Sequence, residues 1–502
     1  MVADTLYAEH AKVTSLAKLL LYKTGGNPFF INQFLTKLYS EGYFTRNKNT
    51  WEWTWDMAQI ESVRITDNMA ESMTQQLQNL PDMTKDILQV AACIGDYFDL
   101  GTLESVIKKI EFFQAKSATI DWMFVVSNLM PAIEQGLVVL KMGDSASPAG
   151  TYQFSHGWVR DVSYSSMPNE IRSRTHWQIG QLFLEDNGDD AKLFDIVDQL
   201  NNGKACIADI AEKRKLAQLN LTVGEKAKEN MSYQSAKKYL ATGIDLLGQE
   251  HWQTDYRLMF KLNQAQGECA FLIGDFEKSD QLLNNAMNKA TSQLDKADIC
   301  VTKIIQLSGQ GKHHQAVVVM VEALNMLGLD VPMLTEKETY MKLTMAEIEL
   351  YQANMQEQTI DDLWNLPLMK NEEMKAILRI VGVAFDSIAV STPQLLPFFA
   401  SKATNLSIEY GNVPYSTLAH ALLAVIAVQM WKDLKHAYDL AYLGFRLNQE
   451  KLPSPDIITK VSYLYSIYSF LQYHITDSIE RFNNTFQIGV DVGDSVYADY
   501  AI

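Results

Sequence analysis

The sequence of 502 residues has few cysteines and lacks the short motifs that mark common enzyme and metal sites. Its four cysteines form no CxxC pair, so neither a zinc site nor a disulfide framework is indicated. A Gly-Lys pair precedes Ala205 and His313 but never Ser or Thr, so no phosphate-binding P-loop is present. The patterns GxGxxG, HExxH and GxSxG are absent too. We therefore expect no enzyme active site, no metal and no cofactor in this chain.

Long apolar runs and an excess of positive charge are also missing. The most apolar runs are about half the ~20 residues that span a bilayer, and the first residues contain no apolar core of signal-peptide length. A formal net charge of −17 argues against nucleic acid or an anionic membrane as a partner, because such binding rests on Lys and Arg. Each cysteine stands in an apolar helical context, which predicts small buried thiols and fits a reducing, cytoplasmic location.

The length and the helical periodicity of the chain predict a mainly α protein of several domains. Residues 1–80 read as a helical subdomain with one hairpin, in which Trp51, Trp53 and Trp55 alternate with polar residues at the period of a strand. The tryptophans could form a platform for a sugar or a partner, or an apolar face that packs the hairpin on the helices. We favour packing.

The segment KTGGNPFFINQFL, residues 23–35, predicts a sharp corner between two helices. Gly25 can end the first helix in the left-handed region, Asn27 can cap the second, and Pro28 fits its first turn. On physical grounds alone, a corner is sufficient to explain these residues.

Residues 81–175 predict small helices followed by two short strands and a polar loop, the outline of a winged-helix domain. Many winged helices bind DNA, but residues 82–175 hold eight Lys and Arg against eleven Asp and Glu. The stretch 117–140, which would contain the groove-reading helix, holds no Lys or Arg. We therefore expect a packing element rather than a DNA reader. His156 ends the second strand, where local hydrogen bonds can explain an imidazole.

Residues 176–502 are helical almost throughout, and their pattern repeats. The small residues Ala236, Ser279 and Ala316 are the anchors of three similar segments, and Ala437 and Ile479 are those of a later pair. The segments are 233–247, 276–290, 313–327, 434–447 and 475–489. Periods of this length with paired helices predict a tetratricopeptide-like solenoid, whose usual role is protein docking. An irregular helical domain with chance similarity has less support, because several copies agree.

Two smaller features of the helical region carry expectations. His313 and His314 are adjacent and do not share a helix face, so we interpret them as solvated loop residues. The last repeat stops part-way into a first helix, and the first residues of the chain enter a helical subdomain with nothing before it. Both ends of the chain therefore look cut.

Five stretches together carry a resemblance to a known family. They are TGGNPFFINQFL, LPDMTKDILQVAACIGDYFDLGTL, YQFSHGWVRDVSYSSMP, IVDQLNNG and LAQLNLTVGEKAKENMSYQSAKKYL. In this order they closely resemble the region after the ATPase core in multi-sensor Ser/Thr–histidine signalling kinases, which are common in cyanobacteria and other bacteria. These kinases carry a Ser/Thr-kinase-like domain, a STAND-type ATPase, a helical repeat region, and GAF and histidine-kinase modules. The resemblance extends over essentially all 502 residues.

The resemblance implies an ATPase lid at 1–80, its winged helix at 81–175 and the repeat region at 176–502. It implies that Gly26, Asn27 and Pro28 lie over a nucleotide, ATP or ADP with Mg²⁺, held by a core that this chain lacks. The helix start at Pro28 would offer amides and a positive dipole end to an anion. His156 is the candidate for the winged-helix His that reaches the diphosphate. The family usually has Asp after this His, whereas Gly157 follows here, so a tight ADP-bound resting state is not implied.

Three functional hypotheses follow. The first is a regulatory segment of a signalling kinase, whose partners are its parent's own ATPase core, kinase and GAF modules and a protein on the repeat surface. The second is a free-standing repeat adaptor that binds a protein or peptide. The third, a transcription regulator, predicts DNA binding, which the charge argues against.

Overall fold

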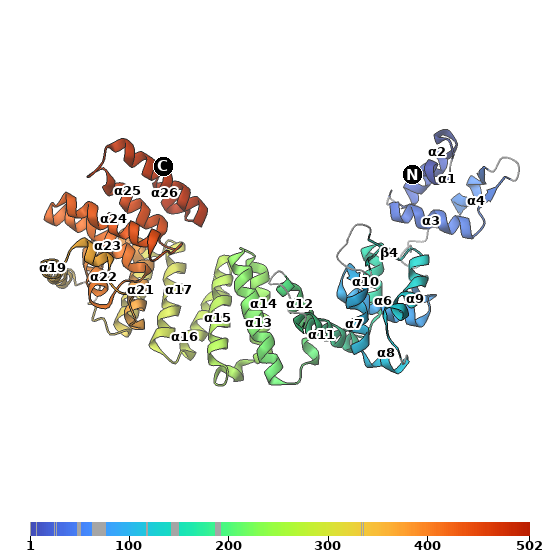
Figure 1. Cartoon of the computed structure of the whole chain (residues 1–502), viewed down its shortest axis with the longest axis horizontal. Helices are drawn as coiled ribbons and strands as arrows, with labels where there is room; N and C mark the ends of the chain where they lie inside the picture. The colour runs from blue at the N-terminus through green and yellow to red at the C-terminus, as the bar shows by residue number, and fades with distance from the viewer. Residues whose placement is uncertain are drawn as a thin grey trace. The chain divides into compact units, whose positions relative to one another are not determined.

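The structure is a computed structural model of the chain. It describes residues 2–6, 8–24, 26, 28–47, 52–62, 77–116, 119–141, 150–185, 192–332, 334 and 336–502. The chain divides into two compact units, Met1–Val223 and Gly224–Ile502, and each is described by itself. Helices dominate both units and the strands are few and short (Figure 1), so the predicted mainly α architecture is confirmed.

The first part of the N-terminal unit is a small helical subdomain with a hairpin. Its core contains Leu16, Leu20 and Leu38. Trp53 and Trp55 are half-buried and lie edge-on to Phe44, as expected if they pack the hairpin onto the helices. Trp51 lies outside the described residues. The elements are α1 (Val2–Leu6), α2 (His10–Thr24), α3 (Pro28–Ser40), β1 (Phe44–Arg46), β2 (Trp53–Trp55) and α4 (Met57–Ser62).

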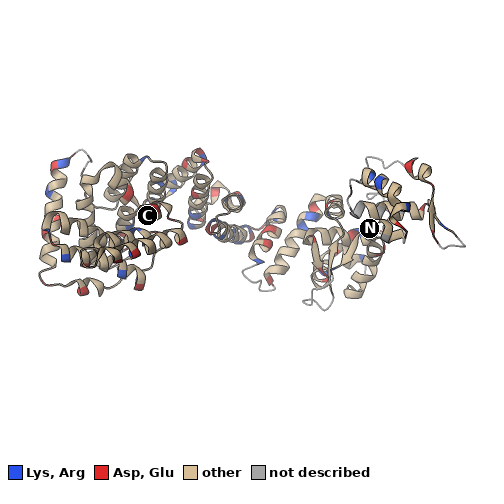
Figure 2. Ribbon diagram, turned by 90° about the horizontal axis from the view of Figure 1, so that it is seen from above, with Lys and Arg blue, Asp and Glu red and all other residues tan. Residues whose placement is uncertain are grey.

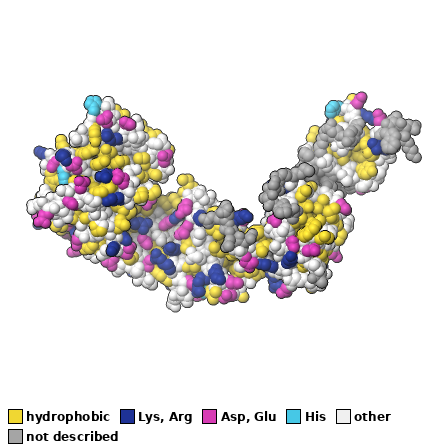
Figure 3. Space-filling model, viewed as in Figure 1, with side chains coloured by type: hydrophobic (Ala, Val, Ile, Leu, Met, Phe, Trp, Pro, Cys, Tyr) yellow, Lys and Arg dark blue, Asp and Glu magenta, His cyan; other side chains and the backbone are white. Residues whose placement is uncertain are grey.

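A second hydrophobic core joins the next set of helices to a three-stranded antiparallel sheet of order β3-β5-β4. The sequence predicted two strands in this segment, and the structure adds a third, β3, before them; that the segment is a winged helix stays a prediction. The exposed side chains of α9 include Trp122, Met123 and Met130, and hydrophobic side chains gather over this helix (Figure 3). They are apolar, unlike the basic residues that contact phosphates. The elements are α6 (Asp82–Ile94), β3 (Tyr97–Asp99), α7 (Leu100–Lys109), α8 (Glu111–Lys116), α9 (Trp122–Glu134), β4 (Val138–Leu140), β5 (Thr151–Phe154) and α10 (Gly157–Ser166).

A buried polar chain connects α10 to the helices that follow, α11 (Asn169–Glu185) and α12 (Leu193–Asn202). The Gln199 amide donates to the Cys93 carbonyl at 2.9 Å, so its oxygen accepts from His176 Nδ1 at 2.6 Å. His176 Nε2 therefore accepts from the Tyr164 hydroxyl at 2.9 Å. Burial lowers the pKa of His176, and the neutral ring satisfies every partner.

Helix pairs follow, and the first of them begins with α13 (Ile210–Glu229), which crosses the boundary between the two units, so that its last turns belong to the C-terminal unit. The predicted anchors Ala236, Ser279 and Ala316 are buried within the second helices of successive pairs, which confirms the repeat pattern. Gly224 and Gly267 lie in the first helices at the same place in two repeats, where a Cβ would press on a leucine of the paired helix. The helices are α13 (Ile210–Glu229), α14 (Tyr233–Leu247), α15 (Tyr256–Leu272), α16 (Phe276–Lys289), α17 (Gln293–Gly309) and α18 (His313–Met326), with the short η3 (Gln249–Trp252).

An insertion then interrupts the repeats without ending them. Helices α19 (Lys337–Asn354) and α20 (Ile360–Trp364) separate α18 from α21 (Glu372–Ser391) in the sequence, yet α21 packs against both α17 and α18. Helix α19 packs instead on α22. The remaining elements are η4 (Pro393–Leu395), α22 (Leu396–Tyr410), α23 (Pro414–Ile426), the π-helical turn η5 (Ala427–Trp431), α24 (Leu434–Glu450), α25 (Ile458–Ser469), α26 (Ile475–Val492) and α27 (Ser495–Tyr500).

The turn inside each early pair contains one residue with positive φ. In two pairs this residue is a glycine, Gly274 or Gly311, at φ values of 84° and 71°. In the α13–α14 pair it is Met231, at 58°. A side chain with a Cβ is strained in this region, so one repeat uses an unfavourable residue where its neighbours have the preferred one.

Three local expectations were wrong. Cys206 is exposed, because it lies in the short η2 turn (Lys204–Cys206) rather than on an apolar helix face. His313 is half-buried in the first turn of α18 and its Nδ1 lies 3.1 Å from the Ser387 hydroxyl, so it is not a loop residue. Ile479 is 56% exposed whereas Ser478 is 4% exposed, so the inward anchor of α26 is one residue earlier than predicted.

The charged side chains of both signs are interspersed along the ribbon (Figure 2). Within the described ranges, no helix is both long and apolar enough to cross a membrane. Among the same residues, no three His, Cys, Asp or Glu side chains lie together as a metal site would require.

Candidate functional site

The predicted nucleotide-contacting residues of the lid lie at the start of α3. Gly25, expected from the sequence to adopt the left-handed conformation, lies outside the described residues; Gly26 has a φ of 79°, and the backbone of α3 begins at Pro28. Asn27 and the side chain of Pro28 lie outside the described residues. The corner is therefore observed at Gly26 and at the start of α3, and the role of these residues toward a nucleotide stays a prediction.

His156 is the N-cap of α10. Its Nδ1 accepts from the Trp158 backbone amide at 3.1 Å, which satisfies one of the free donors in the first helical turn. This is the local hydrogen bonding that the sequence predicted. His156 and Gly26 belong to segments with separate hydrophobic cores, and the sequence contains no P-loop. A nucleotide role for His156 also stays a prediction.

A larger polar feature, not predicted from the sequence, follows the first helices of the repeats in the C-terminal unit. We call it the polar row and define it by Lys228, Arg257, Glu268, Asp295, Asp298, Thr302, Arg379, Asp386, Lys460 and Tyr497. Its members come from α13, α15, α17, α21, α25 and α27. The side-chain pairs between α13, α15 and α17 join successive repeats, whereas those of α21 with α17, α25 and α27 join helices that are far apart in sequence.

The row begins between α13 and α15. Lys228 Nζ lies 2.6 Å from Glu268 Oε2, and the Thr302 hydroxyl of α17 lies 3.2 Å from the other carboxylate oxygen. Burial opposes the charge of Lys228, but Glu268 outweighs it and raises the pKa of the ammonium group. Lys228 therefore keeps its positive charge.

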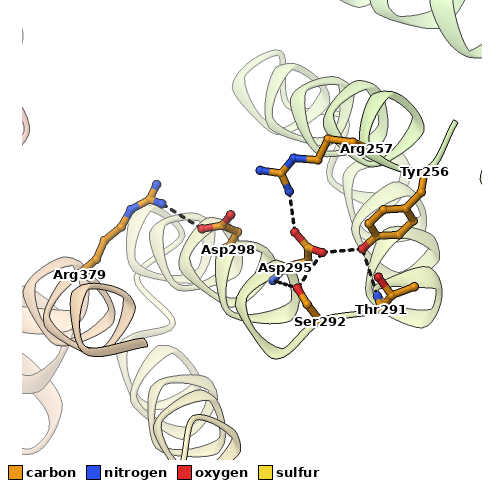
Figure 4. Close-up of polar contacts among 7 residues, drawn as sticks. All are labelled: Tyr256, Arg257, Thr291, Ser292, Asp295, Asp298 and Arg379. Atoms are coloured by element: carbon orange, nitrogen blue, oxygen red, sulfur yellow. Dashed lines mark hydrogen bonds and ion pairs between the residues drawn. The ribbon is translucent and has the colours of Figure 1, made fainter. Parts of the chain in front are cut away.

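Asp295 is the most enclosed carboxylate of the row (Figure 4). It accepts from Arg257 Nη1 at 2.6 Å and from the Tyr256 hydroxyl at 2.7 Å. The Ser292 hydroxyl donates to Asp295 at 2.8 Å, and accepts from the Asp295 amide in return. The phenol of Tyr256 also accepts from the Thr291 amide at 3.0 Å. Asp295 thus fixes the first turn of α17 against α15.

Asp298, one turn later on α17, has a different environment (Figure 4). It pairs with Arg379 of α21 at 3.1 Å, across the insertion, and the two residues are 81 positions apart. Burial raises the pKa of Asp298, although Arg379 and Arg257 oppose the effect. Its charge is therefore less well stabilised than a paired surface carboxylate would be.

The row ends where α27 meets α21. Asp386 accepts from Lys460 Nζ at 2.6 Å and from the Tyr497 hydroxyl at 2.7 Å. The ammonium group also lies 5.5 Å from the centre of the Tyr497 ring. Burial and the Asp386 charge raise the pKa of Tyr497, so the phenol remains a donor.

The polar row offers hydrogen-bonding and charged groups over several repeats, but its charges are mostly paired with one another. It suits recognition of a polar protein surface better than capture of one strongly charged ligand. It contains no paired acid and base in a cavity and no nucleophile beside a base, as catalysis would require. A sequence signal for it does exist, since Lys228 with Glu268 and Arg257 with Asp295 are complementary charges 40 and 38 residues apart. This spacing is close to one repeat.

Comparison with known proteins gives one curated relative of low identity. The chain is 21% identical, over 567 aligned positions, to hybrid signal transduction histidine kinase G of Dictyostelium discoideum. The alignment includes 100% of this chain and 16% of that protein, so the chain spans about a sixth of the relative's length. No protein-family model matches the chain.

Among solved structures, the chain is similar to a signal transduction ATPase with numerous domains (STAND) from Pyrococcus horikoshii. That protein carries a tetratricopeptide repeat sensor. The identity is 11% and the TM-score 0.36, over 86% of this chain and 60% of the other.

Proposed function

We propose that this chain is a regulatory and protein-interaction segment of a multidomain signal-transduction kinase. The observation that carries the proposal is the repeat array of the C-terminal unit, with its polar row across successive first helices. Repeat arrays of this kind present extended surfaces to protein partners. The alignment of the whole chain with part of a hybrid histidine kinase supports the signalling context.

Within such a kinase, the N-terminal unit would serve as the lid and winged helix of a nucleotide-switch ATPase. The core that binds ATP or ADP with Mg²⁺ would lie outside this chain. Gly26, Asn27, Pro28 and His156 would contact the nucleotide only when that core is present. Exchange of the nucleotide would shift the lid and the winged helix between two states, and the repeats would pass the change to downstream modules. The chain itself would hydrolyse nothing.

The nucleotide part of this proposal is tested in the full-length parent protein. Pro28→Ala and His156→Ala are expected to change the affinity for ADP and the rate of nucleotide exchange, measured with a fluorescent nucleotide. Thr36→Ala, an exposed position of α3, is the control and should behave like the parent. If both variants match the parent, the two residues have structural roles only.

The interaction part is tested with the polar row. Arg379→Glu is expected to weaken binding of the chain to the parent's separately prepared ATPase core, kinase or GAF modules, measured by titration calorimetry. Lys435→Glu, at an exposed position of α24 outside the row, is the matched charge reversal and should leave binding unchanged. If the parent chain, Arg379→Glu and Lys435→Glu bind the modules equally tightly, the row has no docking role.

A free-standing repeat adaptor is the alternative, because the same array would serve it equally well. The coding DNA on either side separates the two. An open frame that continues into a P-loop upstream and kinase modules downstream supports the signalling kinase, whereas a true start and stop codon at these positions supports the adaptor. Salt-dependent binding of duplex DNA by residues 81–175 would instead support the transcription regulator.

A further inference from the structure

Four tyrosines and one arginine form a compact group on the last repeats, apart from the polar row. We call it the tyrosine–arginine cluster: Tyr438 and Tyr442 of α24, Tyr465 of α25, Tyr473 between α25 and α26, and Arg481 of α26. The rings of Tyr438 and Tyr442 are stacked, 5.9 Å apart and 7° from parallel. Tyr465 and Tyr473 lie 6.1 and 5.8 Å from Tyr438. Hydrophobic side chains gather over α24 and α25, with basic side chains among them (Figure 3).

Arg481 brings a positive charge into this aromatic group. Its guanidinium carbon lies 4.4 Å from the ring centre of Tyr473 and 5.6 Å from that of Tyr465. It forms no ion pair with any described carboxylate, and Nη1 is buried without a hydrogen-bond partner among the described residues. The other arginines named above have acidic partners: Arg257 has Asp295 and Arg379 has Asp298.

An unpaired guanidinium donor beside aromatic rings is costly. Contact with tyrosine faces recovers about 0.5–2 kcal/mol, whereas a buried donor left unpaired loses about 1–3 kcal/mol, more when it is charged. Such a group calls for an explanation, and a ligand that supplies the missing acceptor is one. A carboxylate is the natural partner, because it accepts two parallel hydrogen bonds from the guanidinium plane.

The surroundings give the rest of the ligand's chemistry. Tyr442 and Tyr473, whose rings both lie against Tyr438, are 39% and 43% exposed, so part of the aromatic surface near the cation is open to solvent. The Tyr438 hydroxyl donates to that of Tyr473 at 3.4 Å, which leaves the Tyr473 hydroxyl hydrogen free to be donated to a ligand. Arg481 is the one cation that the described ring contacts place over this cluster, which favours a singly charged anion over a phosphate dianion.

We propose that the tyrosine–arginine cluster binds an acidic peptide segment of a partner protein, in which a carboxylate lies beside an aromatic residue. The carboxylate pairs with Arg481 and accepts from Tyr473, and the aromatic side chain packs on the exposed part of Tyr442. The site lies on different residues from the polar row and does not depend on the nucleotide part of the proposed function.

The test uses the full chain and two matched peptides, N-acetyl-Asp-Phe-amide and N-acetyl-Asn-Phe-amide, with inorganic phosphate as a third probe. Binding is followed by tyrosine fluorescence and by calorimetry. The acidic peptide is expected to bind at least about ten-fold more tightly than the neutral one, a difference of about 1.4 kcal/mol. Arg481→Met should abolish the difference, Arg481→Lys should keep part of it, and Tyr473→Phe should reduce it several-fold. Arg446→Met, a control on α24 whose guanidinium lies over Trp364, should keep the full difference.

The unfolding temperature without peptide separates a binding role from a structural one. If Arg481 serves to bind a ligand, Arg481→Met should unfold at the same temperature as the parent or at a higher one, because the substitution removes an unpaired charge. Equal binding of the two peptides by the parent, or a preference that survives in Arg481→Met, would overturn the proposal. So would phosphate binding more tightly than the acidic peptide. Should Arg481→Met fail to fold, Tyr473→Phe and Arg481→Lys decide in its place. If the peptide experiments fail, the expected effect of Arg379→Glu on binding to the parent's modules still stands, so the two proposals are tested separately.

Discussion

Lowering the pH from about 7.5 to about 5 is expected to destabilise the C-terminal unit through one buried imidazole, that of His420 in α23. The ring is fully buried, and burial lowers its pKa to about 4. In the unfolded chain its pKa should return to about 6.5. Protonation therefore favours the unfolded state throughout the interval between these two values.

The hydrogen bonds around His420 explain why the neutral form is required. The Asn412 amide donates to the Leu363 carbonyl at 2.9 Å, so the Asn412 oxygen accepts from His420 Nε2 at 3.1 Å. His420 Nδ1 is buried and has no partner among the described residues. A proton placed there would create a buried cation whose second donor lacks an acceptor.

The magnitude follows from linkage between protonation and folding. A folded-state pKa of about 4 and an unfolded value of about 6.5 give a loss of about 2 kcal/mol near pH 5 and almost none near pH 7.5. The sign is that of a base with a depressed pKa: stability is full above about 6.5 and falls as the pH drops below it. A pH near 5 keeps most carboxylates ionised, so the change in stability comes mainly from imidazoles.

Denaturant-induced unfolding of the full chain, followed by circular dichroism at both pH values, measures the effect. His420→Gln keeps a donor for Asn412 but cannot be protonated. The parent should lose about 2 kcal/mol more than this variant between the two pH values. Burial also lowers the pKa values of His176 and His436. Both proteins contain these residues, so their contributions to the loss of stability cancel in the comparison. An equal loss in parent and variant would refute the reasoning.

Three further predictions concern stability, each measured by unfolding of the full chain against the parent. Met231→Gly should raise the free energy of unfolding by about 0.5–1 kcal/mol, because glycine has no Cβ to be strained at positive φ. Gly311→Ala, in the equivalent turn, should lower the free energy of unfolding by a similar amount. Changes of the same sign in the two variants would contradict this. Asp295→Asn should lower the free energy of unfolding by about 1–3 kcal/mol, because it disrupts a buried network. Asp298→Asn should lower it hardly at all, because burial disfavours the charge of Asp298. Equal losses in the two variants would refute the contrast. Tyr164→Phe should cost about 1–2 kcal/mol, because it leaves the buried imidazole of α11 without its donor, and an unchanged midpoint would show that the polar chain has no net effect.

Much of the local architecture could be predicted from the sequence because it rests on short-range patterns. The alternation of Trp53 and Trp55 predicted the hairpin, and the small residues Ala236 and Ser279 predicted which faces of the repeat helices are buried. The error at Ile479 shows the limit of this reasoning, since a similarity aligned one residue out of register moves a side chain by about 100° around a helix. The candidate nucleotide residues came from resemblance, and the structure describes only part of them.

The sequence by itself determined that the chain is a helical protein with tandem repeats and without a P-loop, because helical period, turn residues and motif spacing are local properties of the chain. Only the tertiary structure decided which charges meet. Arg379 reaches Asp298 because α21 packs on α17 across an insertion, and Asp386 meets Tyr497 at a separation of 111 residues. Arg481 likewise lies against Tyr465 and Tyr473, without an acidic partner in the part of the chain that the structure describes. Pairings over such distances depend on how the helices stack, and the pattern of each helix alone does not contain that information.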